Sequence, residues 1–124
     1  MTILIVEDHT EARFYLTQFL NQQGAKVIAS ADAFDGLQAV REHHPDVILS
    51  DISMPNRDGF GFLREIRELG TENGGGVPGI AMTTLGQIAN RNRTMAAGFQ
   101  AHLDKPFRPS QLLEALRSVL NDND

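Results

Sequence analysis

Apolar residues occur in this chain as five short runs, and each run is followed by a longer segment with apolar residues every three or four positions. The runs cover residues 2–6, 26–29, 47–49, 80–82 and 101–103. Runs of this length that are rich in β-branched residues indicate strands, whereas the longer spacing indicates amphipathic helices. The first and third runs are almost continuously apolar, which is typical of strands covered on both faces.

The helical segments end at residues that stop a helix. The first ends at Gly24, the second before Pro45 and the fourth at Gly98, while Pro109 suits the first turn of the last helix. The glycine-rich segment 70–78 predicts a flexible connection. The residues expected to face the core are Ala12, Leu16, Phe19, Leu20, Phe34, Leu37, Val40, Phe62, Leu63, Ile66, Leu69, Ile88, Met95, Ala96, Leu112, Leu113, Leu116, Val119 and Leu120.

Five strands that alternate with five helices predict an α/β fold. Right-handed crossovers then require a parallel sheet with helices on both faces. The pattern does not determine the order of the strands. A length of 124 residues with 41% hydrophobic content is typical of one domain, so we expect residues 1–124 to share a single core.

Composition excludes several classes of function. The net charge of −5, with scattered basic residues, argues against direct nucleic-acid binding. The absence of cysteine excludes disulfides and thiolate metal sites and suits the reducing cytoplasm. No apolar run approaches the roughly 20 residues that span a bilayer, and Met1 leads directly into a strand pattern, so we expect neither membrane insertion nor export.

Three of the apolar runs lead into ionisable residues. Glu7 and Asp8 follow the first run, Asp51 follows the third, and Lys105 follows the fifth. The carboxyl ends of parallel strands meet at one edge of a sheet, where ligands bind. Two carboxylates about 4 Å apart repel by about 4 kcal/mol at an effective dielectric of about 20, so the cluster must take up protons or a cation. Helix capping is a credible role for any one of the three acids, but it is a poor explanation for all three together. A hard dication such as Mg²⁺, with oxygen ligands and waters, suits the cluster.

Four motifs stand in a fixed order along the chain: Glu7-Asp8, Asp51 in DISMP, Thr83 in AMTT and Lys105-Pro106 in LDKPF. Through these motifs, and over essentially its whole length, the chain resembles the receiver domain of two-component response regulators. The resemblance implies a flavodoxin-like, doubly wound, five-stranded sheet of order 2-1-3-4-5 with five helices, so that the first and third strands are neighbours.

The resemblance implies that Asp51 is a phosphoacceptor. A carboxylate held beside a dication can attack a phosphoryl group in line, giving an acyl phosphate. In the family, Mg²⁺ is bound directly by Asp8 and Asp51, through a water by Glu7, and by the backbone carbonyl of Ser53. The alternative for Asp51 alone is a turn residue before Pro55.

The resemblance also assigns the residues that respond to the phosphoryl group. Thr83 and Lys105 contact it, and the Lys105–Pro106 bond is cis in the family. Thr83 and His102 form the switch, with His102 in place of the usual tyrosine or phenylalanine. An imidazole there makes the switch weaker or pH-sensitive, or else is a hydrogen-bonded strand histidine. Thr84 is larger than the residue that relatives usually carry, which affects the access of water to Asp51.

The partners implied are a histidine kinase or a histidine phosphotransfer protein, which docks around His9, Glu11, Ala12 and Tyr15. A downstream protein or output domain reads the face formed by residues 86–98, 101–103 and 110–120. A homodimer that depends on phosphorylation is compatible with the resemblance.

Two features outside the motifs have a structural interpretation. His9 and the pair His43-His44 lack the spacing of a helical zinc site, so we expect them in solvated positions. Asp58 precedes Gly59 at the predicted start of the third helix, where it suits a cap.

Three alternatives remain open. A degenerate receiver acts as an interaction module without phosphorylation. A haloacid-dehalogenase-type phosphatase also forms an aspartyl phosphate, but Asp51-Ile52-Ser53 lacks the second acid of its motif and no cap domain follows. A flavodoxin needs a phosphate-binding loop after the first strand, where Glu7 and Asp8 repel phosphate.

Overall fold

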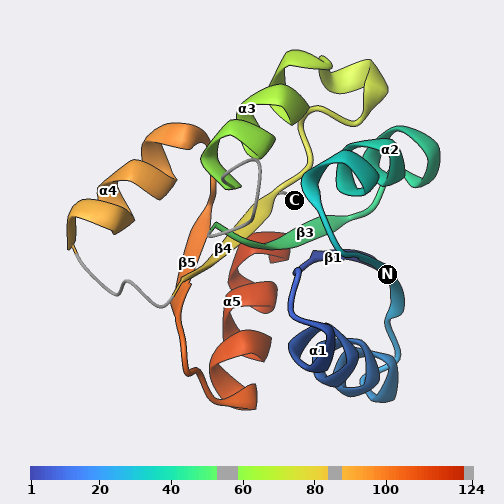
Figure 1. Cartoon of the computed structure of the whole chain (residues 1–124), viewed down its shortest axis with the longest axis vertical. Coiled ribbons are helices and arrows are strands. Elements are labelled where there is room, and N and C mark those ends of the chain that lie inside the picture. Colours follow the sequence, from blue (N-terminus) through green and yellow to red (C-terminus); the bar gives the residue numbers. More distant parts are fainter. Residues whose placement is uncertain (53–58, 84–87, 122–124) are drawn as a thin grey trace.

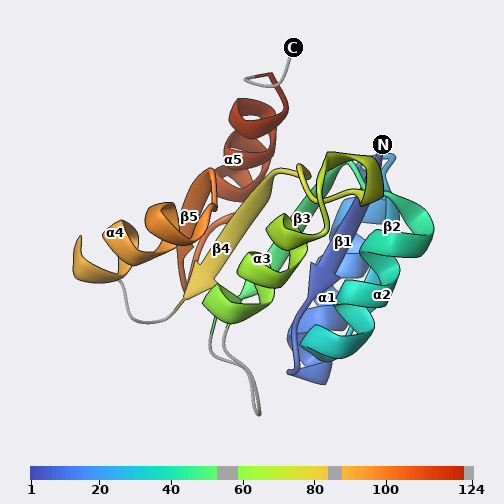
Figure 2. The same cartoon turned by 90° about the horizontal axis from the view of Figure 1, so that it is seen from above.

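A computed structural model of the chain describes residues 1–52, 59–83 and 88–121. Five parallel strands form one sheet in the order β2-β1-β3-β4-β5 (Figures 1 and 2). The predicted α/β fold and the strand order implied by the resemblance are confirmed. The strands are β1 (Thr2–Val6), β2 (Lys26–Ser30), β3 (Val47–Asp51), β4 (Gly79–Thr83) and β5 (Ala101–Asp104), and the helices are α1 (Thr10–Gln22), α2 (Ala33–His43), α3 (Gly59–Glu68), η1 (a 3₁₀ turn, Thr71–Asn73), α4 (Ile88–Ala97) and α5 (Pro109–Asn121).

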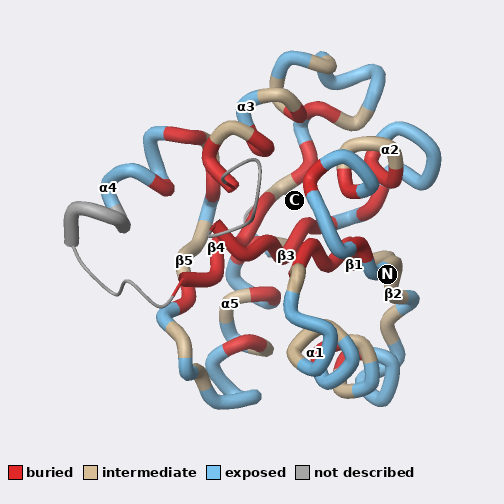
Figure 3. The backbone as a smooth tube through the Cα atoms, in the orientation of Figure 1, coloured by how far each residue is buried: buried red, intermediate tan, exposed pale blue. Residues whose placement is uncertain are grey.

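The helices form a layer on each face of the sheet. Helices α1 and α5 cover one face, and α2, α3 and α4 cover the other (Figures 1 and 2). Strands β1, β3 and β4 are therefore buried on both sides, as Figure 3 shows. Neighbouring residues of β1 serve different cores, since Leu4 packs on the α2–α3 side and Ile5 on the α1–α5 side. Each such fully buried side chain stabilises the fold by about 1.5–3 kcal/mol.

Three predicted core residues are exposed. Phe34 is 67% exposed, Met95 is 53% exposed, and Ala96 is exposed beside Met95. In α2 the buried face is made of small side chains, including Ala33, Gly36 and Ala39, which bring the helix close to the sheet. Phe34 is rotated from Ala33 by about 100° around the helix and therefore faces outward. Apolar periodicity alone does not reveal which face a small-residue helix buries.

Segment 70–78 is more ordered than its glycines predicted. It contains η1, and the guanidinium of Arg67 donates hydrogen bonds to the carbonyls of Gly75 and Val77. A Cβ atom at Gly75 would lie 2.7 Å from the backbone of Gly70 and Ile66, so the chain packs too tightly there for a side chain. The prediction of a flexible connection is wrong for this segment, because the half-buried guanidinium of Arg67 ties its carbonyls to α3.

Candidate functional site

Two carboxylates meet at the carboxyl ends of β1 and β3. Val6 pairs in register with Ser50, so the next residues of the two strands, Glu7 and Asp51, are brought to the same edge. The side chain of Glu7 is completely buried, and Asp51 is 6% exposed. Asp51 is the last residue of β3 rather than a turn residue after it, and the amide of Ile52 still donates to Met82 O at 3.1 Å. The sheet thus fixes the position of both acids.

Lys105 bridges these two acids. Its Nζ lies 2.7 Å from Glu7 Oε1 and 3.2 Å from Asp51 Oδ2. The backbone amide of Lys105 donates to Thr83 O at 2.7 Å, which ties the segment after β5 to the end of β4. The Lys105–Pro106 bond is cis, as the resemblance implied. The ammonium therefore offsets the repulsion between two carboxylates that belong to different strands.

The bridge changes the protonation equilibria of both partners. Burial raises the pKa of Glu7, the charge of Asp51 acts in the same direction, and the hydrogen bond from Lys105 opposes them only in part. Burial lowers the pKa of Lys105, but its hydrogen bond to Glu7 and the charges of Asp51 and Glu7 outweigh that effect and raise it. Lys105 is consequently a cation at neutral pH, and Glu7 binds a proton more readily than an isolated carboxylate does.

The loop between β1 and α1 carries the remaining predicted ligands. Carboxylate oxygens of Glu7 and Asp8 and a ring nitrogen of His9 lie within 4.8 Å of one another. The amide of His9 donates to Glu7 Oε2 at 3.3 Å. Arg13 donates to Glu7 O at 2.8 Å and to Asp8 O at 3.4 Å. Reasoning from the sequence missed Arg13, whose position inside the first turns of α1 is the only signal that could have found it.

These residues fit a divalent cation. Glu7 and Asp8 offer hard carboxylate oxygens in close proximity, and the charge of Asp51 acts on Glu7 from the neighbouring strand. Oxygen donors of this kind, with room for water, are the ligands that Mg²⁺ prefers. Ser53, the predicted source of a backbone ligand, lies outside the described residues, as do Thr84 and Asp58.

The predicted switch residues Thr83 and His102 occupy different environments. Thr83 is completely buried at the end of β4. The imidazole of His102 is 4% exposed, with Nδ1 3.3 Å from Thr94 Oγ1 and Nε2 2.8 Å from Asp104 Oδ1. His102 is therefore a hydrogen-bonded strand histidine that links β5 to α4. Reasoning from the sequence missed Thr94 as the partner of His102, because it identified only core-facing apolar residues in this helix.

The predicted docking residues lie around the start of α1. His9 and Glu11 are exposed, Ala12 is half-buried, and Tyr15 is 55% exposed and stacked on Phe19. A cavity of about 480 Å³ connects this area with Lys105. The cavity is lined by Glu7, Ala12, Tyr15, Leu16, Met82, Lys105, Pro106 and Phe107. Phe107 was not predicted, although it follows Lys105-Pro106 directly in the sequence.

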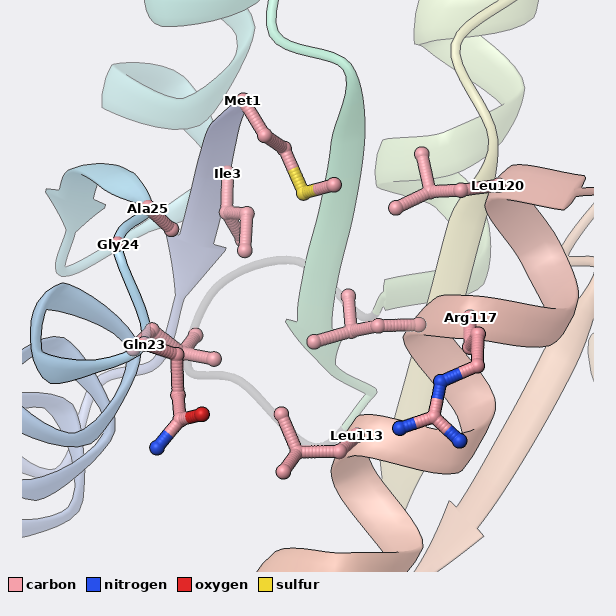
Figure 4. Close-up of a pocket in the computed structure, with 10 residues that line it drawn as sticks. Met1, Ile3, Gln23, Gly24, Ala25, Leu113, Arg117 and Leu120 are labelled. Atoms are coloured by element: carbon pink, nitrogen blue, oxygen red, sulfur yellow. The ribbon is translucent and has the colours of Figure 1, made fainter.

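A second cavity lies at the opposite end of the sheet (Figure 4). It occupies about 300 Å³ between the start of β1, the end of α1 and the second half of α5. Among the described residues that line it, Arg117 is the only charged one. It contains none of the carboxylates at the other edge and has no part in their chemistry. His43 and His44 are also exposed away from that edge, at the end of α2, as predicted.

Within the described ranges, no helix has the length and apolar character needed to cross a bilayer.

A protein-family model matches most of the chain. Residues 3–117 match the model of the response regulator receiver domain. The chain is 34% identical over 122 residues to the chemotaxis protein CheY of Bacillus subtilis, covering 96% of this chain and 97% of that one. It is 35% identical over 118 residues to the "Probable transcriptional regulator ycf27" of Guillardia theta, covering 95% of this chain but 44% of the relative. The chain thus spans about half the length of the ycf27 regulators that it matches.

Two solved structures are similar to this chain in both fold and sequence. The chemotaxis protein CheY4 of Vibrio cholerae superposes with a TM-score of 0.89 at 30% identity, covering 96% of this chain and 98% of that one. The receiver domain of the sensor histidine kinase PA1611 from Pseudomonas aeruginosa superposes with a TM-score of 0.86 at 32% identity, covering 97% of both chains. The latter structure has a magnesium ion coordinated in its active site cleft.

Proposed function

This chain belongs to the family of response regulator receiver domains, and we propose that it accepts a phosphoryl group on Asp51 in a reaction that depends on Mg²⁺. The donor in this proposal is the phosphohistidine of a histidine kinase or histidine phosphotransfer protein, and the transfer takes place in the cytoplasm. Residues 1–124 act as one receiver domain that catalyses only its own phosphorylation and dephosphorylation. The observation that carries the proposal is the ammonium of Lys105 held between the carboxylates of Glu7 and Asp51.

Asp51 is the nucleophile in this reaction. One carboxylate oxygen attacks phosphorus in line, the new O–P bond forms as the P–N bond to the donor imidazole breaks, and the leaving nitrogen keeps the electron pair. The product is an acyl phosphate on Asp51. Mg²⁺ bound by Asp8 and Asp51, with Glu7 acting through a water and Ser53 through its carbonyl, would offset the charge that develops on the phosphoryl oxygens.

Lys105 and Thr83 respond to the phosphoryl group. The ammonium of Lys105 keeps its short contact with Glu7 and exchanges Asp51 for a phosphoryl oxygen, while the hydroxyl of Thr83 donates to another. Two charge-assisted contacts contribute about 3–6 kcal/mol. A complete shift between two states needs about 5.5 kcal/mol, so a partner that prefers the phosphorylated form completes the switch.

The proposed partners use two separate surfaces. The donor docks on the exposed residues at the start of α1, His9, Glu11, Ala12 and Tyr15, beside the cavity that reaches Lys105. The cavity supports this role because it joins an apolar surface to Lys105, whose ammonium contacts Asp51. The output partner, or a second phosphorylated copy, binds the face formed by α4, β5 and α5, where His102 links the first two elements.

Incubation of the protein with acetyl phosphate and Mg²⁺ tests the proposal. We expect intact-protein mass spectrometry to show the added mass of one phosphate on the wild type and none on Asp51→Asn. Asp104→Asn is the matched control, because Asp104 also ends a strand at this edge but pairs with His102. Equal labelling of Asp51→Asn would refute the assignment, and an unlabelled wild type would favour the phosphorylation-independent interaction module.

A further inference from the structure

His9 adds a nitrogen donor to the carboxylate cluster. Its ring nitrogen and the carboxylate oxygens of Glu7 and Asp8 all lie within 4.8 Å of one another. Ligand atoms that sit about 2.1 Å from a common ion can be up to about 4.2 Å apart. The 4.8 Å limit exceeds this span by about 0.6 Å, so a small rotation of the exposed His9 side chain would bring the three atoms onto one cation.

The loop that carries these residues is held in place before any cation binds. The carbonyls of Glu7 and Asp8 accept hydrogen bonds from the guanidinium of Arg13, and the carbonyl of His9 accepts one from the amide of Arg13 at 2.9 Å. The amide of His9 in turn donates to Glu7 Oε2. Ligands fixed in this way lose little conformational freedom on binding, which favours affinity.

Among residues 1–52, 59–83 and 88–121, the imidazole of His9 has no hydrogen-bond or ion-pair partner that competes with a cation. The residue precedes α1 and makes no side-chain cap of that helix. Its side chain is exposed, next to the half-buried Asp8 and the completely buried Glu7. A related receiver domain, 32% identical, holds a magnesium ion in its active site cleft, which is independent support for a cation at this edge.

We propose that His9 is a direct nitrogen ligand of the cation site and gives this receiver affinity for transition-metal ions that bind imidazole well, such as Zn²⁺ and Ni²⁺, in addition to Mg²⁺. Imidazole suits Zn²⁺, Cu²⁺ and Ni²⁺, whereas carboxylate and water suit Mg²⁺. A nitrogen donor therefore strengthens binding of the former ions much more than that of Mg²⁺. The inference rests on the proposed use of a divalent cation by Glu7, Asp8 and Asp51.

Titration of the metal-free protein, residues 1–124, with metal ions tests its selectivity for Zn²⁺ over Mg²⁺. Affinities for Zn²⁺ and for Mg²⁺ are measured by calorimetry on the wild type and on His9→Gln, with the double variant His43→Gln/His44→Gln as the matched control for exposed histidines. We expect His9→Gln to lower the ratio of Zn²⁺ to Mg²⁺ affinity by about tenfold or more. We expect the control variant to keep the wild-type ratio of Zn²⁺ to Mg²⁺ affinity. An unchanged ratio in His9→Gln overturns the proposal.

Pulsed electron paramagnetic resonance with Mn²⁺ alone identifies the ligand directly. We expect a ¹⁴N coupling from a coordinated imidazole in the wild type and in His43→Gln/His44→Gln, and its loss in His9→Gln. Mn²⁺ binding without that coupling overturns the role of His9 while leaving a carboxylate cation site in place. A wild type that binds neither Mn²⁺ nor Mg²⁺ instead contradicts the proposed function itself, so the two failures are distinguishable.

Discussion

Replacing Lys105 by methionine removes the ammonium from between two buried carboxylates and keeps most of the aliphatic stem. At 2.7 Å from Glu7 and 3.2 Å from Asp51, and with an effective dielectric of about 20, the two attractions amount to roughly 6 and 5 kcal/mol. Desolvation of the three groups cancels much of this sum, and breaking a buried pair typically costs about 3–5 kcal/mol. The side chain of Lys105 is 23% exposed, so solvent screening favours the lower end, about 3 kcal/mol.

Urea unfolding at pH 7 measures this loss in the free energy of unfolding. Lys26→Met is the matched control, because Lys26 is the only other lysine and is exposed at the start of β2. We expect the control to change stability by less than about 0.5 kcal/mol. A loss below about 1 kcal/mol for Lys105→Met would show that the bridge adds almost nothing to stability.

The loss should depend on pH and on Mg²⁺. Burial raises the pKa of Glu7 above 4.5, so the folded state binds its proton more tightly than the unfolded state, and stability from this group falls as the pH rises through the raised pKa. Loss of the ammonium raises that pKa further. The deficit of Lys105→Met should therefore shrink as the pH is lowered toward 4.5, and saturating Mg²⁺ should recover part of it at pH 7. A deficit that is the same at every pH and Mg²⁺ concentration would refute the electrostatic account.

Three further predictions concern the scaffold. Arg67→Met leaves the buried carbonyls at Gly75 and Val77 without their donor, so urea unfolding should show that the free energy of unfolding falls by about 3 kcal/mol. Arg64→Met, at an exposed position on the same helix, should leave the free energy of unfolding almost unchanged. Gly36→Ala places a Cβ 2.9 Å from a methyl group of Val6, and thermal unfolding should register a loss of about 1–3 kcal/mol. His102→Leu removes the link between β5 and α4. Hydrogen exchange should show that the free energy of opening of α4 falls by about 1 kcal/mol, and unchanged protection would contradict that link.

Much of the fold follows from local patterning. The apolar runs of β1 and β3 and the stop signals at Gly24 and Pro45 depend only on neighbouring residues, so the alternation of strands and helices is readable without coordinates. The strand order was available only through the resemblance, because periodicity contains no information on which strands pair. Small buried residues such as Gly36 explain why Phe34 was misjudged, since the helix face nearest the sheet was not the most apolar one.

The sequence by itself determined which chemistry this chain has: three acids and a lysine placed directly at or after apolar runs. Only the tertiary structure decided which of them touch, since Lys105 and Glu7 are separated by 98 positions and meet at 2.7 Å. It also gave His102 its partner on α4. The physical reason is that hydrophobic burial selects strands and helices through short-range periodicity. Contacts between polar groups depend instead on strand order, register and side-chain direction, which arise only when the whole sheet assembles.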